Sequence, residues 1–187
     1  MLIISIERLT SKKGRYLMFS VGQYVICGNK GACTVEDITT LDITGVDKGK
    51  MYYILKPVYI SASTVYIPVD SAAVSMRRML TKEEAERLIQ EIPQIDALEI
   101  TNEKLLEQNY KECMKANCCT ELVKLIKTIY LRRQKRLETG RKETAVDSKY
   151  FRIAEDNLYG ELALSLNMER KDVCKYITEQ LQGLNTV

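Results

Sequence analysis

The chain has 187 residues, of which 45% are hydrophobic and 28% are charged, enough for one large or two small domains around an apolar core. No apolar run approaches the ~18–20 residues of a membrane span, and the apolar start is too short for a signal peptide, so we expect a cytoplasmic protein. The sequence has no histidine and no glycine-rich phosphate-binding motif, which removes the most common general base and metal ligand and argues against an enzyme.

The cysteines lack the Cys-x-x-Cys spacing that is typical of zinc and redox sites. There are six, namely Cys27, Cys33, Cys113, Cys118, Cys119 and Cys174. We expect reduced thiols, with no metal and no cofactor.

The net charge of +3 is unevenly distributed along the chain. Residues 81–123 carry five basic and ten acidic side chains, whereas residues 124–142 carry eight basic and one acidic side chain. A short segment with a large positive charge inside a neutral to acidic half indicates a contact with an anionic partner.

Residues 1–17 differ in pattern from the residues that follow. Gly14-Arg15 can be encoded by a purine-rich ribosome-binding sequence just before Met18, so we expect translation to start at Met18. A flexible tail is the alternative.

Residues 18–79 are rich in β-branched and aromatic residues, separated by glycine- and serine-containing turns. The expected strand segments are Tyr24–Ile26, Cys33–Val35, Ile38–Leu41, Met51–Leu55 and Thr64–Val69. Five short strands at this spacing predict an SH3- or Tudor-like β-barrel. Pro68 predicts an edge or a strand end, because proline cannot donate a ladder hydrogen bond.

From residue 80 onward the apolar period becomes helical. Thr81 and Glu84 form a capping box at the start of a helix that Pro93 ends, and Pro93–Thr101 is a candidate linker. Further helices are expected at 101–116, 120–138, 147–166 and 169–182. The predicted fold is therefore α+β with two domains: the barrel at 18–79, a helix and linker at 80–100, and an all-α domain at 101–187.

This order of elements resembles the CarD/CdnL family of bacterial RNA-polymerase-binding regulators, and the barrel is also similar to the polymerase-interacting module of transcription–repair coupling factors. The resemblance covers residues 18 to about 166. It rests on blocks at Met18–Val25, Gly31–Val35, Tyr52–Lys56, Val65–Val69, Lys127–Arg133 and Gly160–Leu164. The chain departs from the family in lacking tryptophan, and it has Ala116–Cys119 where the family tends to carry Ser-Gly-Asp.

The resemblance implies that part of the barrel adds to a sheet of the polymerase β subunit. The implied polymerase-binding residues are Thr40, Val65, Tyr66, Ile67 and Pro68. An ordinary strand with Val65 and Ile67 toward the core is compatible with this role, since alternation leaves Tyr66 outward.

The basic segment predicts a strip that contacts nucleic-acid phosphates, the alternative being a solvated helix face. Its candidate residues are Lys124, Lys127, Arg132, Arg133, Lys135 and Arg136, together with Lys111 and Lys149 on neighbouring helices. The resemblance places Leu106 where the family has a tryptophan that enters the minor groove.

We therefore expect a transcription regulator that binds the polymerase β subunit and contacts promoter DNA near the upstream edge of the bubble, which alters open-complex stability. A second reading is an SH3-like and helical protein that binds nucleic acid without the polymerase. A third is an enzyme that uses a thiol or carboxylates, which a cysteine of strongly lowered pKa would support.

Overall fold

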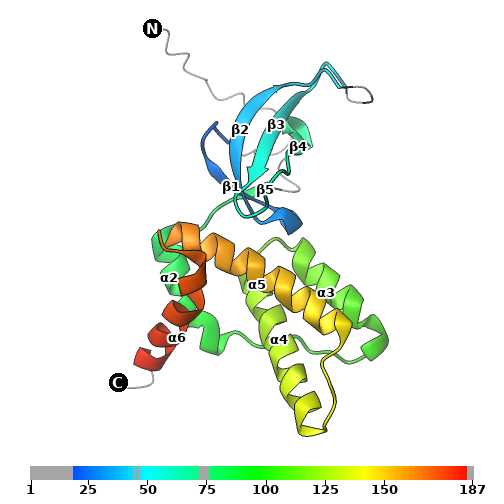
Figure 1. Cartoon of the computed structure of the whole chain (residues 1–187), viewed down its shortest axis with the longest axis vertical. Helices are drawn as coiled ribbons and strands as arrows, with labels where there is room; N and C mark the ends of the chain where they lie inside the picture. The colour runs from blue at the N-terminus through cyan, green and yellow to red at the C-terminus, as the bar shows by residue number, and fades with distance from the viewer. Residues whose placement is uncertain (1–18, 44, 46, 72–75, 185–187) are drawn as a thin grey trace.

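The computed structural model describes residues 19–43, 45, 47–71 and 76–184. A five-stranded sheet is followed by a set of helices, with the sheet at one end of the molecule and the helices at the other (Figure 1). The predicted α+β class is therefore confirmed. The expected start at Met18 and the residues before it lie outside the described residues.

The sheet is antiparallel, with strand order β4-β3-β2-β1-β5. Its strands are β1 (Tyr24–Cys27), β2 (Ala32–Thr40), β3 (Met51–Pro57), β4 (Val65–Pro68) and β5 (Met76–Arg78). The register between β2 and β3 shifts between Val35 and Asp37. Such a bulge bends a strand, so a single nine-residue strand, β2, joins the two segments predicted separately on either side of it.

Alternating side chains of the strands fill the core of the sheet domain. Val25, Cys33, Val35 and Leu55 have no exposed surface, and Ile67 of β4 packs with them. The hydroxyl of buried Tyr53 accepts a hydrogen bond from the backbone N–H of Phe19, which closes one end of this core. The outward residues of the edge strand are therefore left for other contacts.

The α-helices that follow the sheet in residues 76–184 are α2 (Lys82–Glu91), α3 (Leu106–Lys115), α4 (Cys119–Glu138), α5 (Ala145–Ser165) and α6 (Val173–Leu184). Thr81 and Glu84 form both hydrogen bonds of the predicted capping box. Gly140 follows α4 with φ at +67°, and the N–H of Arg141 donates to the Arg136 carbonyl, as in a Schellman motif.

The segment predicted as a linker, 93–101, packs on the helical core instead of separating two bodies. Ile95, Leu98 and Ile100 contact that core, and the N–H of Leu98 donates to Thr128 Oγ1 at 2.7 Å. Since α2 contacts α6 and α5, the helical domain begins at α2. The junction between the two domains is the short stretch after β5, residues 79–81.

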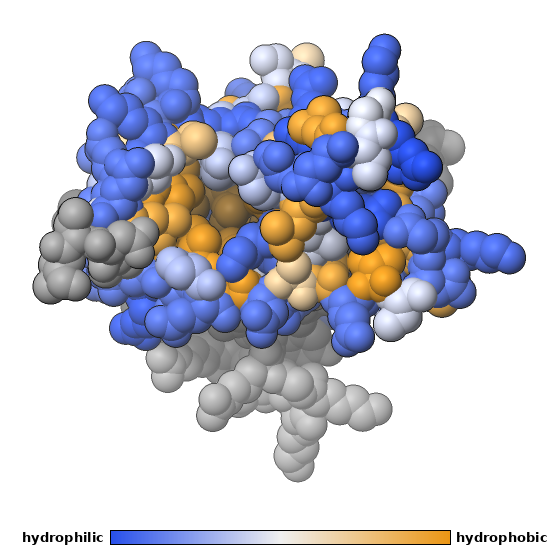
Figure 2. All heavy atoms as spheres, turned by 90° about the horizontal axis from the view of Figure 1, so that it is seen from below, coloured by the Kyte–Doolittle hydropathy of each residue, from blue (hydrophilic) through white to orange (hydrophobic). Residues whose placement is uncertain are grey.

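Figure 2 shows the molecule from below the view of Figure 1, with apolar and hydrophilic side chains in neighbouring patches around a hollow. Among the described residues, no helix combines the length and the apolar character required to cross a membrane.

Candidate functional site

The edge of the sheet at β4 is free of any strand on its outer side among the described residues. Within the described ranges β4 pairs with β3 alone, in a register that matches Ile67 with Tyr53 and Tyr66 with Ile54. Alternate backbone N–H and C=O groups of such a strand point away from its neighbour and can pair with a further strand.

The side chains of β4 alternate in exposure along this edge. Ile67 is buried, while Tyr66 is 47% exposed and lies on the opposite face of the strand. Val65 and Pro68 are half-buried. Thr40 lies at the exposed end of β2 opposite Met51 of β3, two strands away from the edge. The structure therefore brings four of the five predicted polymerase-binding residues together on one strand and leaves Thr40 apart from them.

The ammonium group of Lys127 is used within the fold. It donates to the backbone carbonyls of Ile92, Pro93 and Ile95, at 2.9, 3.3 and 2.5 Å, where α2 ends. The Ile92 carbonyl also accepts from the N–H of Ile95, so Lys127 adds a second hydrogen bond there. Lys127 therefore caps the end of α2, and its contact with phosphates stays a prediction.

Three further cations of the basic segment have acidic partners inside the molecule. Arg132 is bidentate to Glu103, at 2.6 and 3.0 Å, and also contacts the buried Asp147. Hydrogen bonds from Arg132 lower the pKa of Glu103. Arg133 pairs with Glu143 and stacks on Phe151, and Lys124 pairs with Glu121.

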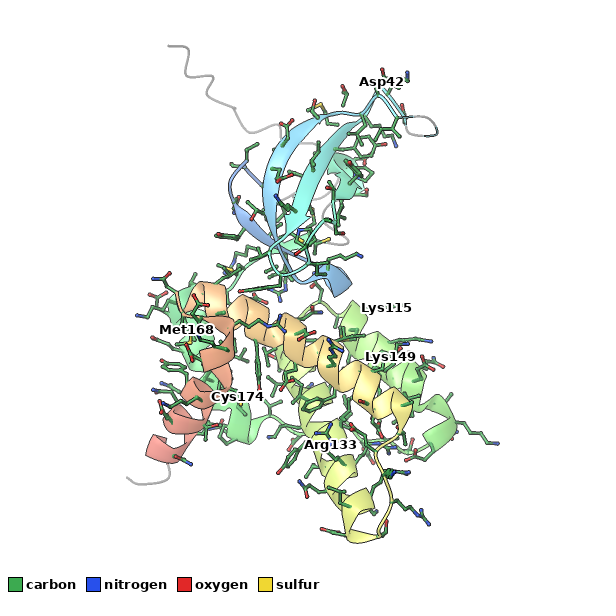
Figure 3. The ribbon with its side chains drawn as sticks, in the orientation of Figure 1. Asp42, Lys115, Arg133, Lys149, Met168 and Cys174 are labelled. Carbon is green, nitrogen blue, oxygen red and sulfur yellow. The ribbon has the colours of Figure 1, made fainter. Side chains whose placement is uncertain are left out.

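Lys111 and Lys149 share one carboxylate. Both ammonium groups lie near Glu107, at 3.3 and 3.8 Å, and Lys149 also lies over the ring of Tyr150. Both lysine side chains are more than half exposed, so surface ion pairs of this kind hold them weakly. Figure 3 shows Lys149 on α5 and Lys115 at the end of α3, while Arg133 lies on α4.

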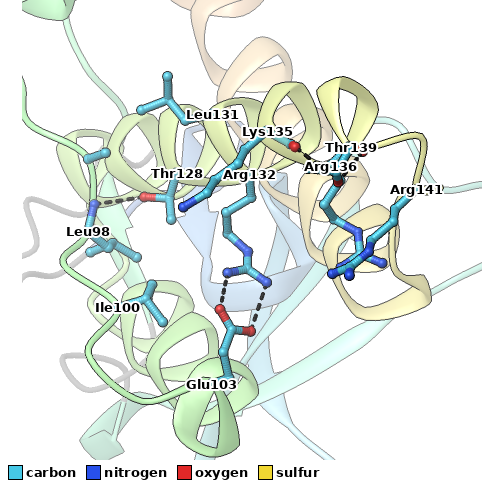
Figure 4. A pocket seen from close by; sticks show the side chains of 11 residues that line it. Leu98, Ile100, Glu103, Thr128, Leu131, Arg132, Lys135, Arg136, Thr139 and Arg141 are labelled. Atoms are coloured by element: carbon cyan, nitrogen blue, oxygen red, sulfur yellow. Dashed lines mark hydrogen bonds and ion pairs between the residues drawn. The ribbon is translucent and has the colours of Figure 1, made fainter.

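Lys135, Arg136 and Arg141 have no acidic partner within ion-pair distance in the described part of the chain. All three line one pocket at the C-terminal half of α4, opposite the segment 97–103 (Figure 4). The positive field of the predicted basic strip is thus concentrated at this end of α4, where phosphates could approach it.

Leu106 does not lie at the surface as its predicted role in the minor groove requires. It is 7% exposed and belongs to the helical core, so it could enter a groove only by leaving that core. Its neighbour Leu105 is 46% exposed and stands immediately before the first turn of α3. The exposed apolar side chain at the start of this helix is therefore Leu105.

A buried ion pair between the two domains is absent from the sequence-based prediction. Arg77 of β5 is bidentate to Glu161 of α5, at 2.6 and 2.7 Å, and the Glu161 side chain is 1% exposed. The N–H of Leu80 and the thiol of Cys119 also donate to this carboxylate. Burial lowers the pKa of Arg77, but hydrogen bonds and charge from Glu161 outweigh it and hold that pKa above its ordinary value.

A second contact between the domains surrounds Tyr59, in the loop between β3 and β4. Its hydroxyl donates to the Gly160 carbonyl at 3.1 Å, and the guanidinium of Arg170 lies over its ring. A Cβ at Gly160 would come within 2.9 Å of that ring. The two domains therefore meet through paired charges and close packing.

Of the six cysteines, four are buried and two, Cys118 and Cys174, are exposed. Burial raises the pKa of Cys119, as does the neighbouring charge of Glu161. Burial also raises the pKa of Cys113, to about 11. Cys27 is the thiol with a lowered pKa, through a hydrogen bond from Cys33, but its side chain is buried in the sheet core.

Comparison with protein families gives a match for the sheet domain. Residues 19–80 match the family model described as the CarD-like/TRCF RID domain. A search of curated proteins finds no match to the chain. The matched range holds all five strands and the Arg77 side chain that joins the sheet to α5. The similarity to the CarD-like/TRCF RID domain therefore extends over residues 19–80, and it supports an RNA-polymerase-interacting domain there.

Proposed function

We propose that the chain is a non-catalytic transcription regulator whose sheet domain binds the polymerase β subunit through the free edge of β4. The observation that carries this proposal is an open β4 edge, with Tyr66 exposed beside it, in a domain of a polymerase-interacting family. Pairing of backbone groups supplies affinity in such an interface, and alternate side chains supply specificity.

The helical domain is proposed to contact promoter DNA near the upstream edge of the bubble. Support comes from Lys135, Arg136 and Arg141, whose charges are not neutralised by acidic side chains in the described residues. Such residues neutralise phosphates and release counterions without reading sequence. Leu105 is the apolar side chain that would enter the minor groove, since apolar wedges can separate base steps there.

Binding by both domains would change the lifetime of the open complex. Docking of the sheet raises the effective concentration of the helical domain at the promoter. The Arg77–Glu161 pair restricts the arc over which that domain can move. Stabilisation requires higher affinity for open than for closed promoter, because equal affinity shifts no population.

Binding of the full chain to a purified β-subunit lobe tests the polymerase contact. We expect Tyr66→Glu to weaken binding at least tenfold, because it places a charge beside the pairing edge. Tyr24→Glu is the matched control, since Tyr24 is 43% exposed on β1, away from that edge. Equal losses from both variants, or none from either, would contradict the β4 assignment.

Absence of any binding by the folded wild-type chain would leave direct nucleic-acid binding without the polymerase as the function. That reading predicts salt-sensitive binding of DNA or RNA by the chain alone, with no complex with the β subunit.

A further inference from the structure

The pocket at the C-terminal half of α4 has a volume of about 610 Å³. Volumes of this order are typical of small-ligand sites. One wall is α4 itself, and the other is the extended segment 97–103, which the Leu98–Thr128 hydrogen bond holds against the helix. The two walls belong to one packed domain, so the pocket is present before any partner binds.

One end of this pocket is apolar. Leu98 and Ile100 come from the extended segment, and Leu131 of α4 also lines the pocket (Figure 4). Leu131 is 56% exposed, an unusual degree of exposure for a leucine that lines a concavity. Removing these three side chains from water would stabilise a complex with a ligand that has an apolar face.

At the centre of the pocket, hydrogen bonds hold the planar guanidinium of Arg132 in place. The guanidinium of Arg132 makes two hydrogen bonds to Glu103 and a third to Asp147. Only 18% of the Arg132 side chain is exposed. A guanidinium immobilised in this way offers a flat surface on which a nucleobase can stack.

The other end of the pocket carries concentrated positive charge. Arg136 and Arg141 lie next to one another, since the Schellman motif joins their backbones, while the side chain of Lys135 lines the pocket closer to Thr128 (Figure 4). Glu103 is the acidic side chain among the lining residues, and both of its oxygens are occupied by Arg132. An anion of high charge density would relieve the repulsion among these cations.

We propose that this pocket binds an unpaired nucleotide, with its phosphate at Arg136 and Arg141 and its base over Leu131 and Arg132. The proposal rests on the nucleic-acid contact of the proposed function and deepens it. A melted promoter strand and a free nucleotide share this chemistry. An acidic peptide fits less well, because its carboxylates could pair with the arginines but bring no aromatic base to cover Leu131 and Arg132.

Fluorescence anisotropy with the full chain and a labelled thymidine 12-mer tests the proposal, beside an identical strand without bases and a duplex of the same length. We expect the base-bearing strand to bind at least about fivefold more tightly than the abasic strand, as one stacked base supplies. Leu131→Ala should bring this ratio close to one. The matched control is Leu137→Ala, because Leu137 is 58% exposed on the same helix and does not line the pocket.

Replacing a cation should have a different signature from replacing Leu131. Arg141→Gln should weaken the base-bearing and abasic strands by the same factor, since it removes only a phosphate contact. Arg152→Gln, on the exposed surface of α5, is the control for the loss of one charge. Competition with thymidine monophosphate distinguishes a melted strand from a free nucleotide as the ligand. If the monophosphate displaces the strand, the pocket also binds free nucleotides; if it does not, the pocket binds the strand alone.

The proposal is overturned if the wild type binds both strands equally, or if Leu131→Ala leaves the ratio unchanged. If the duplex then still binds in a salt-dependent manner, the proposed promoter contact stands and the nucleotide pocket fails. If no oligonucleotide binds at all, both proposals fail. Tighter binding of a glutamate- and leucine-containing peptide than of the strand, lost in Leu131→Ala, would assign the pocket to a protein partner and also overturn the proposal.

Discussion

Lys127 and Lys135 lie on the same helix and carry the same charge, but their ammonium groups have different surroundings. Lys127 caps three carbonyls at the end of α2, and Lys135 faces the pocket without an acidic partner in the described residues. The same substitution at the two positions should therefore separate a structural role from a binding role.

We expect Lys127→Gln to lower the free energy of unfolding by about 1–3 kcal/mol, because charge-assisted hydrogen bonds to backbone carbonyls are lost. Its DNA affinity should change little. Lys135→Gln should leave stability within about 0.5 kcal/mol and lower the salt slope of DNA binding by about one. Urea unfolding and anisotropy titrations at several salt concentrations measure both effects. A salt slope that falls in Lys127→Gln and not in Lys135→Gln would contradict the assignment.

Composition predicts the basic segment but not which of its cations are free. The carbonyl partners of Lys127 precede it by 32 to 35 residues, and Glu103 precedes Arg132 by 29. Pairings of this range depend on how the helices pack, which periodicity does not determine. The same limit explains Leu106: helical phase within one turn decides whether Leu105 or Leu106 is buried, and a short 3₁₀ turn over Glu103–Leu105 sets that phase.

At the scale of elements, Gly160 lies inside α5 at a point where the sheet domain leaves no room for a larger side chain. Glycine destabilises a helix interior relative to alanine by about 1 kcal/mol. Here a Cβ would come within 2.9 Å of the Tyr59 ring, whose hydroxyl donates to the Gly160 carbonyl. Crowding and helix propensity therefore act in opposite directions at this position.

We expect Gly160→Ala to destabilise the protein by about 1–3 kcal/mol, the range typical of overpacking. In a Tyr59→Ala background the same change should be neutral or stabilise by up to about 1 kcal/mol, because only helix propensity remains. A double-mutant cycle from urea unfolding measures this coupling. Equal effects of Gly160→Ala in both backgrounds would show that Tyr59 is not the limiting contact.

The helices were predictable because each has a long apolar period and terminal signals, such as the capping box at Thr81 and the glycine after α4. β5 was not predicted as a strand. Its three residues, Met76–Arg78, include two arginines and show no alternation, and pairing with β1 alone defines it. The open β4 edge was predictable in part from Pro68, but strand order depends on long-range pairing.

For the whole molecule, the buried Arg77–Glu161 pair joins the sheet to the helices across 84 residues of sequence. Removal of one partner from a buried pair leaves a charge without compensation, which costs about 3–5 kcal/mol. The two domains should therefore unfold together, with this pair as a main contact between them.

We expect Glu161→Gln to lower the free energy of unfolding by about 3–5 kcal/mol, while Glu86→Gln on the exposed surface of α2 changes it by less than about 0.5 kcal/mol. Replacing both partners, as Arg77→Met with Glu161→Leu, should recover most of the loss, because neither charge remains buried alone. Calorimetry and urea unfolding give these values. A double variant as unstable as Glu161→Gln would show that this charge pair is not the cause.

The proposed function requires that the main chain of β4 pairs with a strand of the polymerase β subunit. Residue-resolved amide exchange of the full chain, measured with and without a saturating β-subunit lobe, tests it most directly. We expect new protection at β4, Val65–Pro68, with little change at β5, the opposite edge of the sheet. Saturated binding with protection at β5 or on the helices, and none at β4, would contradict it.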